Sequence, residues 1–286
     1  MKFGLMFANA GPWSLPDNAA AMAAAADEFG IESLWTVEHV VVPKDYSSQY
    51  PYSSSGRMPG PEETPIPDPL IWLSWMAART TTVRLCTGIL ILPQRSPVVL
   101  AKEVATLDVL SGGRVTLGVG VGWLEEEFDA IGVPFAERGP RTDEAIDALR
   151  ILWTEPEPTY KGRFYRFEAA KSYPHPAQAG GVPIVVGGHT KAAARRAGRL
   201  GDGFFPARAS IDELTVLLAE MRRAAEEAAR DADRIEITAG GALDPDGIRR
   251  YADLGVSRMI LPPMAFDPDG LRTGLERFAN DVMAKL

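Results

Sequence analysis

Short apolar runs alternate with longer amphipathic stretches along the whole chain. The short runs predict strands, and the stretches with apolar residues every three or four positions predict helices. The predicted strands are residues 3–8, 33–37, 83–92, 115–119, 183–186, 203–206, 235–238 and 257–261. The predicted helices are residues 16–29, 69–79, 98–110, a long helix within 137–153, and residues 191–200, 211–231, 246–254 and 271–283.

This order gives eight strand–helix units and therefore predicts an α/β fold with a parallel sheet. Eight units in 286 residues fit a (β/α)8 barrel, the TIM barrel, and a doubly wound open sheet is the structural alternative. No linker rich in Pro, Gly or Ser divides the sequence, so we expect a single domain over residues 1–286.

Two segments interrupt the alternation. Residues 40–67 contain six prolines and three tyrosines, and a loop of this length is usually a functional lid or a passive excursion. Because it follows the second strand, at the barrel end where active sites lie, we favour a lid. Residues 156–181 form an insertion between units four and five, and residues 159–167 within it predict a small hairpin.

Composition and charge exclude several classes of protein. Apolar residues make up 46% of the chain and the formal net charge is −8, which is typical of a globular protein and unfavourable for binding nucleic acid. No run of 18 uncharged apolar residues occurs, and the N-terminus predicts a strand rather than a signal peptide. We therefore expect no membrane segment and a cytoplasmic location.

Few residues are available to bind a metal. The one cysteine, Cys86, excludes an internal disulfide and a cysteine-based zinc site, and the three histidines are scattered along the sequence. We expect no metal. The 23 arginines against seven lysines indicate a GC-rich, bacterial source genome.

Common cofactor and nucleophile motifs are absent. The run from Gly118 to Gly122 lacks the third glycine of a dinucleotide fingerprint, because Trp123 stands at that position. The sequence has neither a phosphate-binding P-loop nor the GxSxG turn of a serine hydrolase.

Three places nevertheless carry candidate chemistry. Glu38 and His39 end the second strand, where an imidazole oriented by the adjacent carboxylate would be an acid/base, and a strand-end ion pair is the alternative. Gly88 interrupts the third strand, which indicates a bulge beside a ligand or a simple kink. Gly187 and Gly188 open a helix, which fits a phosphate site or a tight turn capped by Thr190.

The helix that follows these glycines is basic. Lys191, Arg195 and Arg196 could meet an acidic ligand tail, although a solvated helix face is the more common role for such residues.

At this point the sequence resembles a known family. The run VRLCTGILILPQRSPVVLAKEVATLDVLSGGRVTLGVGVGW, together with SLWTVEH and PIVVGGHT…AGRLGDGF, resembles the luciferase-like monooxygenases, and within them the branch that uses the deazaflavin coenzyme F420. The resemblance covers nearly the whole chain in order. It implies a (β/α)8 barrel with the flavin or deazaflavin at the carboxyl mouth.

The resemblance also implies site residues. It implies a cis peptide between Gly88 and Ile89 behind the ring, and an acid/base at His39 beside Glu38. The residues implied against the cofactor are Thr87, Gly88, Ile89, Trp123, Glu126, Gly187, Gly188 and His189. Trp123 stands where the sugar-phosphate dehydrogenases of the branch carry a catalytic glutamate, which argues against a sugar-phosphate substrate and leaves Glu126 as the nearest second acid.

The resemblance implies an F420-dependent oxidoreductase that transfers a hydride between the deazaflavin and a small organic substrate, with His39 exchanging the substrate proton. It also implies a homodimer. Two alternatives stay open: an FMN-dependent monooxygenase of the same family, and a barrel that binds a ligand without catalysis.

Overall fold

The computed structural model describes residues 1–207 and 209–286. The barrel strands are β1 (Lys2–Leu5), β2 (Ser33–Thr36), β3 (Arg84–Thr87), β4 (Leu90–Ile91), β5 (Val115–Gly120), β8 (Ile184–Gly187), β9 (Gly203–Phe205), β10 (Glu236–Gly240) and β11 (Val256–Leu261). The strand order is β3-β2-β1-β11-β10-β9-β8-β5-β4, and a pairing of β3 with β5 closes the ring. All of these pairings are parallel. The predicted (β/α)8 barrel is confirmed.

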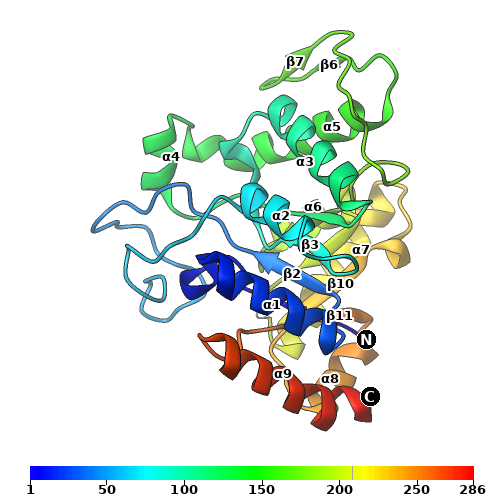
Figure 1. Ribbon diagram of the computed structural model, residues 1–286. Helices are drawn as coiled ribbons and strands as arrows, with labels where there is room; N and C mark the ends of the chain where they lie inside the picture. Colours follow the sequence, from blue (N-terminus) through cyan, green and yellow to red (C-terminus); the bar gives the residue numbers. More distant parts are fainter. Residues whose placement is uncertain (208) are drawn as a thin grey trace.

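Helices surround this barrel (Figure 1). They are α1 (Pro16–Glu28), α2 (Pro69–Ala77), α3 (Pro97–Ser111), α4 (Glu125–Ile131), α5 (Arg138–Thr154), α6 (Lys191–Leu200), α7 (Ile211–Glu227), α8 (Pro245–Asp253) and α9 (Pro268–Asp281). The first and last helices, α1 and α9, pack side by side, as their strands β1 and β11 pair in the barrel, and both chain ends lie near this place (Figure 1).

Local sequence signals position several helix starts. Asp68 caps α2 by accepting hydrogen bonds from the backbone N–H groups of Leu70 and Ile71, and Ser210 with Glu213 forms a capping box at α7. A capping side chain satisfies N–H groups that the helix itself leaves unpaired. Asp68 matters for the site as well, because α2 begins where the 40–67 segment ends.

The structure differs from the predicted elements in two places near the barrel mouth. The third strand is broken into β3 and β4, because the chain bulges at Gly88 and Ile89 and the peptide between them is cis. The short helix α4 was not predicted. The hairpin within residues 159–167 is confirmed as β6 (Tyr160–Lys161) and β7 (Arg166–Phe167), which project away from the barrel (Figure 1).

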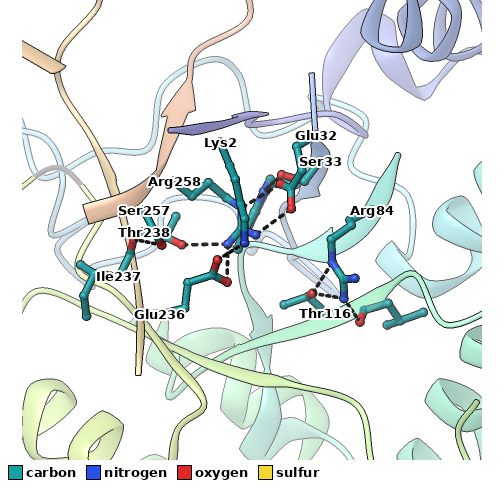
Figure 2. Close-up of polar contacts among 12 residues, drawn as sticks. Lys2, Glu32, Ser33, Arg84, Thr116, Glu236, Ile237, Thr238, Ser257 and Arg258 are labelled. Carbon is teal, nitrogen blue, oxygen red and sulfur yellow. Dashed lines mark hydrogen bonds and ion pairs between the residues drawn. The ribbon is translucent and has the colours of Figure 1, made fainter. Parts of the chain in front are cut away.

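Side chains fill the barrel interior in layers. At the amino ends of the strands, the buried guanidinium of Arg258 bonds to Glu32, Glu236 and Thr238 (Figure 2). Above it lies a layer formed by Trp35, Cys86, Val185, Phe205 and Ile260. The interior is therefore a packed core, and active sites of such barrels lie at the carboxyl end.

Among the helices of the residues described, none is both long enough and apolar enough to cross a membrane.

Candidate functional site

The bulge in the third strand presents Ile89 at the carboxyl mouth of the barrel. A Cβ on Gly120 of β5 would lie 2.6 Å from Ile89 Cδ1, and a Cβ on Gly187 of β8 would lie 2.5 Å from Ile89 Cγ2. The two glycines thus leave room for the half-buried Ile89 side chain, which spreads over two neighbouring strands. We call this apolar surface, formed by Ile89, Gly120 and Gly187, the floor.

Gly88 and Thr87 lie below this floor. A Cβ on Gly88 would lie 2.9 Å from Cε3 of the buried Trp35 ring, so a larger residue there would collide with the core and not with a ligand on the floor. Thr87 is buried, and its hydroxyl donates to the Gly118 carbonyl oxygen at 2.6 Å. The hydroxyl of Thr87 is therefore bonded within the barrel wall, and the expected contact of this residue with the cofactor stays a prediction.

His39 stands at the end of β2 and is paired with Glu127 of α4. The distance from His39 Nδ1 to Glu127 Oε2 is 3.1 Å, and the two side chains are 8% and 0% exposed. The second oxygen, Oε1, accepts hydrogen bonds from the backbone N–H groups of Val40 at 2.5 Å and Val41 at 3.3 Å. One buried carboxylate thus holds both the imidazole and the first residues of the 40–67 segment.

The expectation that Glu38 orients His39 is wrong. Glu38 Oε2 accepts from the Ile91 N–H at 2.5 Å, and Oε1 bonds to Arg95, which also bonds to Asp68 at 2.8 Å. The side chains of adjacent residues at the end of a strand point to opposite sides. Glu38 therefore faces the third strand, and His39 faces away from it. Burial raises the pKa of the Glu38 carboxyl against the pull of Arg95. Glu38 joins the ends of β2 and β4 to the start of α2.

Glu126 fixes the 40–67 segment, which we call the lid. Its Oε1 accepts from the N–H and the hydroxyl of Ser47, at 2.6 and 2.8 Å, and from the N–H of Ser48 at 3.1 Å. Partial desolvation raises the pKa of Glu126, but the hydrogen bonds from the two serines outweigh it and lower the pKa to about 2. Glu126 therefore anchors the lid, and its expected role as a second acid stays a prediction.

The lid covers the mouth with aromatic side chains. Trp123, which follows β5, makes edge-to-face contacts with His39 at 5.7 Å, Tyr46 at 5.5 Å and Tyr50 at 5.2 Å between ring centroids. Further along the lid, Tyr52 contacts the ring of His189 at 4.9 Å. This part of the chain is an ordered cover over residues from three barrel strands, and Figure 1 shows it reaching toward α4.

The predicted phosphate site after β8 is only partly available. Gly188 has φ +120°, a conformation that favours glycine, and its N–H donates to the Phe205 carbonyl oxygen at 3.1 Å. Thr190 caps α6 by accepting from the Ala193 N–H. The Gly188 N–H is therefore not free for an anion, and the tight-turn alternative describes this residue.

A cavity of about 440 Å³ adjoins the exposed His189. Lid residues 51–54 form one side of it, and His189, Ala209, Glu213 and Leu217 form the other. A cavity of this size can hold part of a small ligand. It places His189, though not the glycines before it, beside a space open to a ligand.

The basic residues of α6 are mostly engaged with the protein itself. Arg195 pairs with Glu220 at 2.6 Å, and Arg196 pairs with Asp143 and bonds to the Gly139 carbonyl oxygen. Lys191 is exposed at the start of the helix. Arg195 and Arg196 therefore form intramolecular ion pairs, and this helix supplies less positive charge for an acidic ligand tail than its sequence suggests.

Sequence reasoning missed Glu127, the residue that contacts His39. A signal was present: three consecutive glutamates, Glu125 to Glu127, follow the fourth predicted strand and precede Phe128. Acidic residues cluster in the first turn of a helix because they interact favourably with its dipole. That pattern predicts α4, but it does not say which carboxylate turns inward.

Comparison with known proteins gives one family for this architecture. The family model described as luciferase-like monooxygenase matches residues 1–244. An uncharacterized protein of Mycobacterium tuberculosis is 35% identical over 274 residues, which cover 93% of this chain and 94% of that protein. The F420-dependent glucose-6-phosphate dehydrogenase of Amycolatopsis mediterranei is 33% identical over 232 residues, which cover 78% of this chain and 64% of that enzyme.

Among solved structures, the monooxygenase RslO1 of Streptomyces bottropensis has a similar fold. Its TM-score is 0.78 with 26% sequence identity, and the match covers 100% of this chain and 99% of that one.

Proposed function

The chain belongs to the luciferase-like monooxygenase family, and we propose that within it the protein is an F420-dependent oxidoreductase that transfers a hydride between the deazaflavin and a small organic substrate. The observation that carries this proposal is that the apolar floor of Ile89, Gly120 and Gly187 and the nearly buried His39 both lie at the carboxyl end of the barrel. The floor would support the flat deazaflavin ring, which supplies the hydride chemistry, and His39 would act as the acid/base.

The floor fits a planar ring. Any side chain larger than hydrogen at Gly120 or Gly187 would meet Ile89, so two neighbouring strands add no side chain that would tilt a ring away from the surface. Ile89 would support the ring from behind, and His189, beside the cavity under the lid, would contact another part of the cofactor. When bound, the deazaflavin supplies the hydride chemistry at its C5, and the protein supplies binding and orientation.

His39 would move the substrate proton that accompanies the hydride. Its side chain is nearly buried at the carboxyl end of a barrel strand, where catalytic residues of such barrels lie. An imidazole changes its charge near neutral pH, so it can both accept and return a proton. In this proposal Glu38 stabilises the strand ends and takes no part in proton transfer.

The surroundings of His39 favour a small, uncharged substrate. Trp123 occupies the space next to the imidazole, and the lid residues Tyr46 and Tyr50 pack against Trp123. These aromatic rings supply no positive charge for a phosphate group. We therefore propose an alcohol, aldehyde or enone rather than a sugar phosphate as the substrate class.

One observation favours a second candidate function within the same family. The structural similarity to the monooxygenase RslO1 spans the whole chain, and an apolar floor serves a flavin as well as a deazaflavin. The second candidate is therefore an FMN-dependent monooxygenase, in which reduced flavin activates oxygen.

Titration of the purified protein with oxidised F420 and with FMN separates these functions. Six tryptophans, Trp123 among them near the floor, provide the fluorescence signal. We expect F420 to bind more tightly, and FMN binding of equal or greater strength would overturn the F420 assignment. Binding of neither would indicate the third class, a barrel without a redox cofactor.

A matched pair of variants tests the floor itself. Ile89→Ala should weaken cofactor binding, because it removes the side chain that forms the floor. Ile71→Ala makes the same change at a residue of α2 that is 74% exposed, and it should leave binding unchanged. Equal affinities of the two variants would show that the floor does not hold the cofactor.

A further inference from the structure

We propose that Glu127 is the positioning residue of His39: it fixes the imidazole in the tautomer that can accept a proton at Nε2, and it ties that imidazole to the base of the lid. This inference rests on the proposed role of His39 in proton transfer. It concerns a residue of α4 that does not itself touch the floor or the substrate.

The contacts of Glu127 use both carboxylate oxygens. Oε1 accepts hydrogen bonds from the backbone N–H groups of Val40 and Val41, which can only donate. Oε2 lies 3.1 Å from His39 Nδ1. An ionised carboxylate can only accept hydrogen bonds. A hydrogen bond between Oε2 and His39 therefore requires that Nδ1 carries a proton and donates it.

A proton on Nδ1 decides what the other ring nitrogen can do. In the neutral imidazole only one nitrogen carries a proton, so Nε2 keeps its lone pair. The hydrogen bonds among the residues described leave Nε2 unused. His39 can therefore accept a proton at Nε2, and the carboxylate at Nδ1 stabilises the cation that forms. Carboxylates that orient a histidine act in this way in other enzymes.

The burial of Glu127 is difficult to explain by stability alone. Its side chain is fully buried, and burial of a carboxylate is costly unless every oxygen is paired. The pairs that satisfy it all come from residues 39–41, which include the proposed acid/base and the first residues of the lid. Its neighbour Glu126 holds the lid further on, at Ser47 and Ser48. Trp123 contacts both the imidazole and the lid through ring packing, whereas Glu127 joins them through the hydrogen bonds of one carboxylate.

The central test is Glu127→Gln. The side-chain oxygen of the amide can still accept from Val40 and Val41, but the NH₂ group would then face His39 Nδ1 and donate to it. The imidazole would change to the tautomer with its proton on Nε2, which cannot accept another proton there. We expect kcat to fall by about 10²–10⁴-fold with little change in KM, the range of a lost acid/base.

A readout independent of activity is the ¹⁵N spectrum of the imidazoles. With only three histidines, the signals of His39 are identified by their loss in His39→Ala. In the unmodified protein we expect the neutral ring to carry its proton on Nδ1, and in Glu127→Gln on Nε2. A proton on Nε2 in the unmodified protein would overturn the proposal without any variant, and so would an unchanged tautomer in Glu127→Gln.

Two further variants complete the design. Glu125→Gln makes the same chemical change in the same helical turn at an exposed residue, and it should change neither the tautomer nor kcat. In a His39→Ala background, Glu127→Gln should cause no additional loss, since residues that act through one another are not additive. An equal additional loss would show that Glu127 acts independently of His39.

The failure of this proposal can be distinguished from failure of the proposed function. If His39→Ala leaves turnover unchanged, the assignment of His39 as acid/base is wrong, yet the spectra still decide whether Glu127 sets the tautomer. If His39→Ala abolishes turnover and Glu127→Gln does not alter the spectrum or the rate, only the positioning role is wrong.

Discussion

The two ends of the barrel use buried charge in different ways. At the amino end, Arg258 bonds to Glu32 at 2.8 Å and to Glu236 at 2.9 Å, and Lys2 bonds to Glu236 at 2.5 Å (Figure 2). Each charge in this group has a partner of opposite sign. At the carboxyl end, the pair of His39 and Glu127 leaves one imidazole nitrogen without a hydrogen bond from the described residues.

Unsatisfied polar atoms show the same contrast. Among the described residues, buried atoms without a hydrogen-bond partner include Glu126 Oε2 and the side-chain amide of Gln94, both beyond the carboxyl ends of barrel strands. None of the residues around Arg258 is in this group. Buried polar groups are normally paired, so the comparison teaches that pairing is complete around Arg258, whereas unpaired buried polar atoms remain beyond the carboxyl ends of the strands.

The pKa values of the buried carboxyls differ between the ends as well. Burial alone would raise the pKa of Glu32 and of Glu236, but hydrogen bonds and charge from Arg258 and Lys2 outweigh it and hold both below the usual value of 4.5. Burial of Glu38 at the mouth has the opposite outcome and raises its pKa. The ionised forms of Glu32 and Glu236 are therefore stabilised more effectively than that of Glu38, whereas hydrogen bonds lower the pKa of Glu126, which also lies at the carboxyl end.

The largest effect expected from this comparison is on activity, from a change at the carboxyl end. His39→Ala should lower turnover per folded molecule by about 10²–10⁴-fold, the usual contribution of a general acid/base, with little change in cofactor affinity. The melting temperature should fall as well, because the buried Glu127 loses a partner. His175→Ala, in the 156–181 insertion, is the matched control. A lower melting temperature with unchanged turnover per folded molecule would mean that His39 has a structural role. The carboxyl end would then stabilise the fold, as the amino end does.

The next effect should be on stability, from a change at the amino end. Arg258→Met leaves Glu32 without its partner and leaves Glu236 with Lys2 alone, and loss of one member of a buried ion pair costs about 3–5 kcal/mol. Both glutamates keep some exposure to water, so we expect about 3 kcal/mol, measured by urea unfolding.

The control for this prediction is Arg249→Met. Arg249 pairs with Asp246 on the surface, and loss of such a pair costs about 1 kcal/mol or less. Turnover per folded molecule should be unchanged in both variants. An Arg258 variant as stable as the unmodified protein would contradict the structural role of the amino end.

The smallest expected effect is a dependence of stability on acid pH that originates at the amino end. Because the folded pKa values of Glu32 and Glu236 lie below the unfolded value of about 4.5, their contribution is complete above that pH. It is lost as the pH falls through the lowered folded values. Urea unfolding from about pH 6 down to about pH 3 should show this loss, and Arg258→Met should show less of it. An equal slope in the two proteins would assign the acid sensitivity to other carboxyls.

Much of the barrel could be predicted from the sequence because its signals are local. The alternation of apolar runs and amphipathic stretches gave all eight strand–helix units, and Gly88 within the third strand marked the bulge that splits β3 from β4. The position of His39 at the end of β2 followed from the strand boundary alone. The cis peptide at Gly88 and Ile89, which the family resemblance implied, is present as well.

The errors concern partners that are distant in the sequence. Glu38 is next to His39 in the chain but bonds to Arg95, whereas the partner of His39, Glu127, is 88 residues away. The glycines after β8 suggested a phosphate site, and the space that Gly187 provides is taken by Ile89 of another strand. For Arg195 and Arg196 the sequence favoured a solvated helix face over a contact with an acidic ligand tail, and their acidic partners in the protein, Glu220 and Asp143, are again distant in the sequence.

The sequence by itself determined which segments become strands and helices, and that an imidazole and a bulge stand at the carboxyl end of the barrel. Hydrophobic periodicity encodes these features because each depends on a few consecutive residues. Only the tertiary structure decided which charges meet, since closing the ring brings Glu32 to Arg258 across 226 positions and α4 to the end of β2. The ion pairs at each end of the barrel form only when the ring closes, so a local sequence pattern cannot predict them.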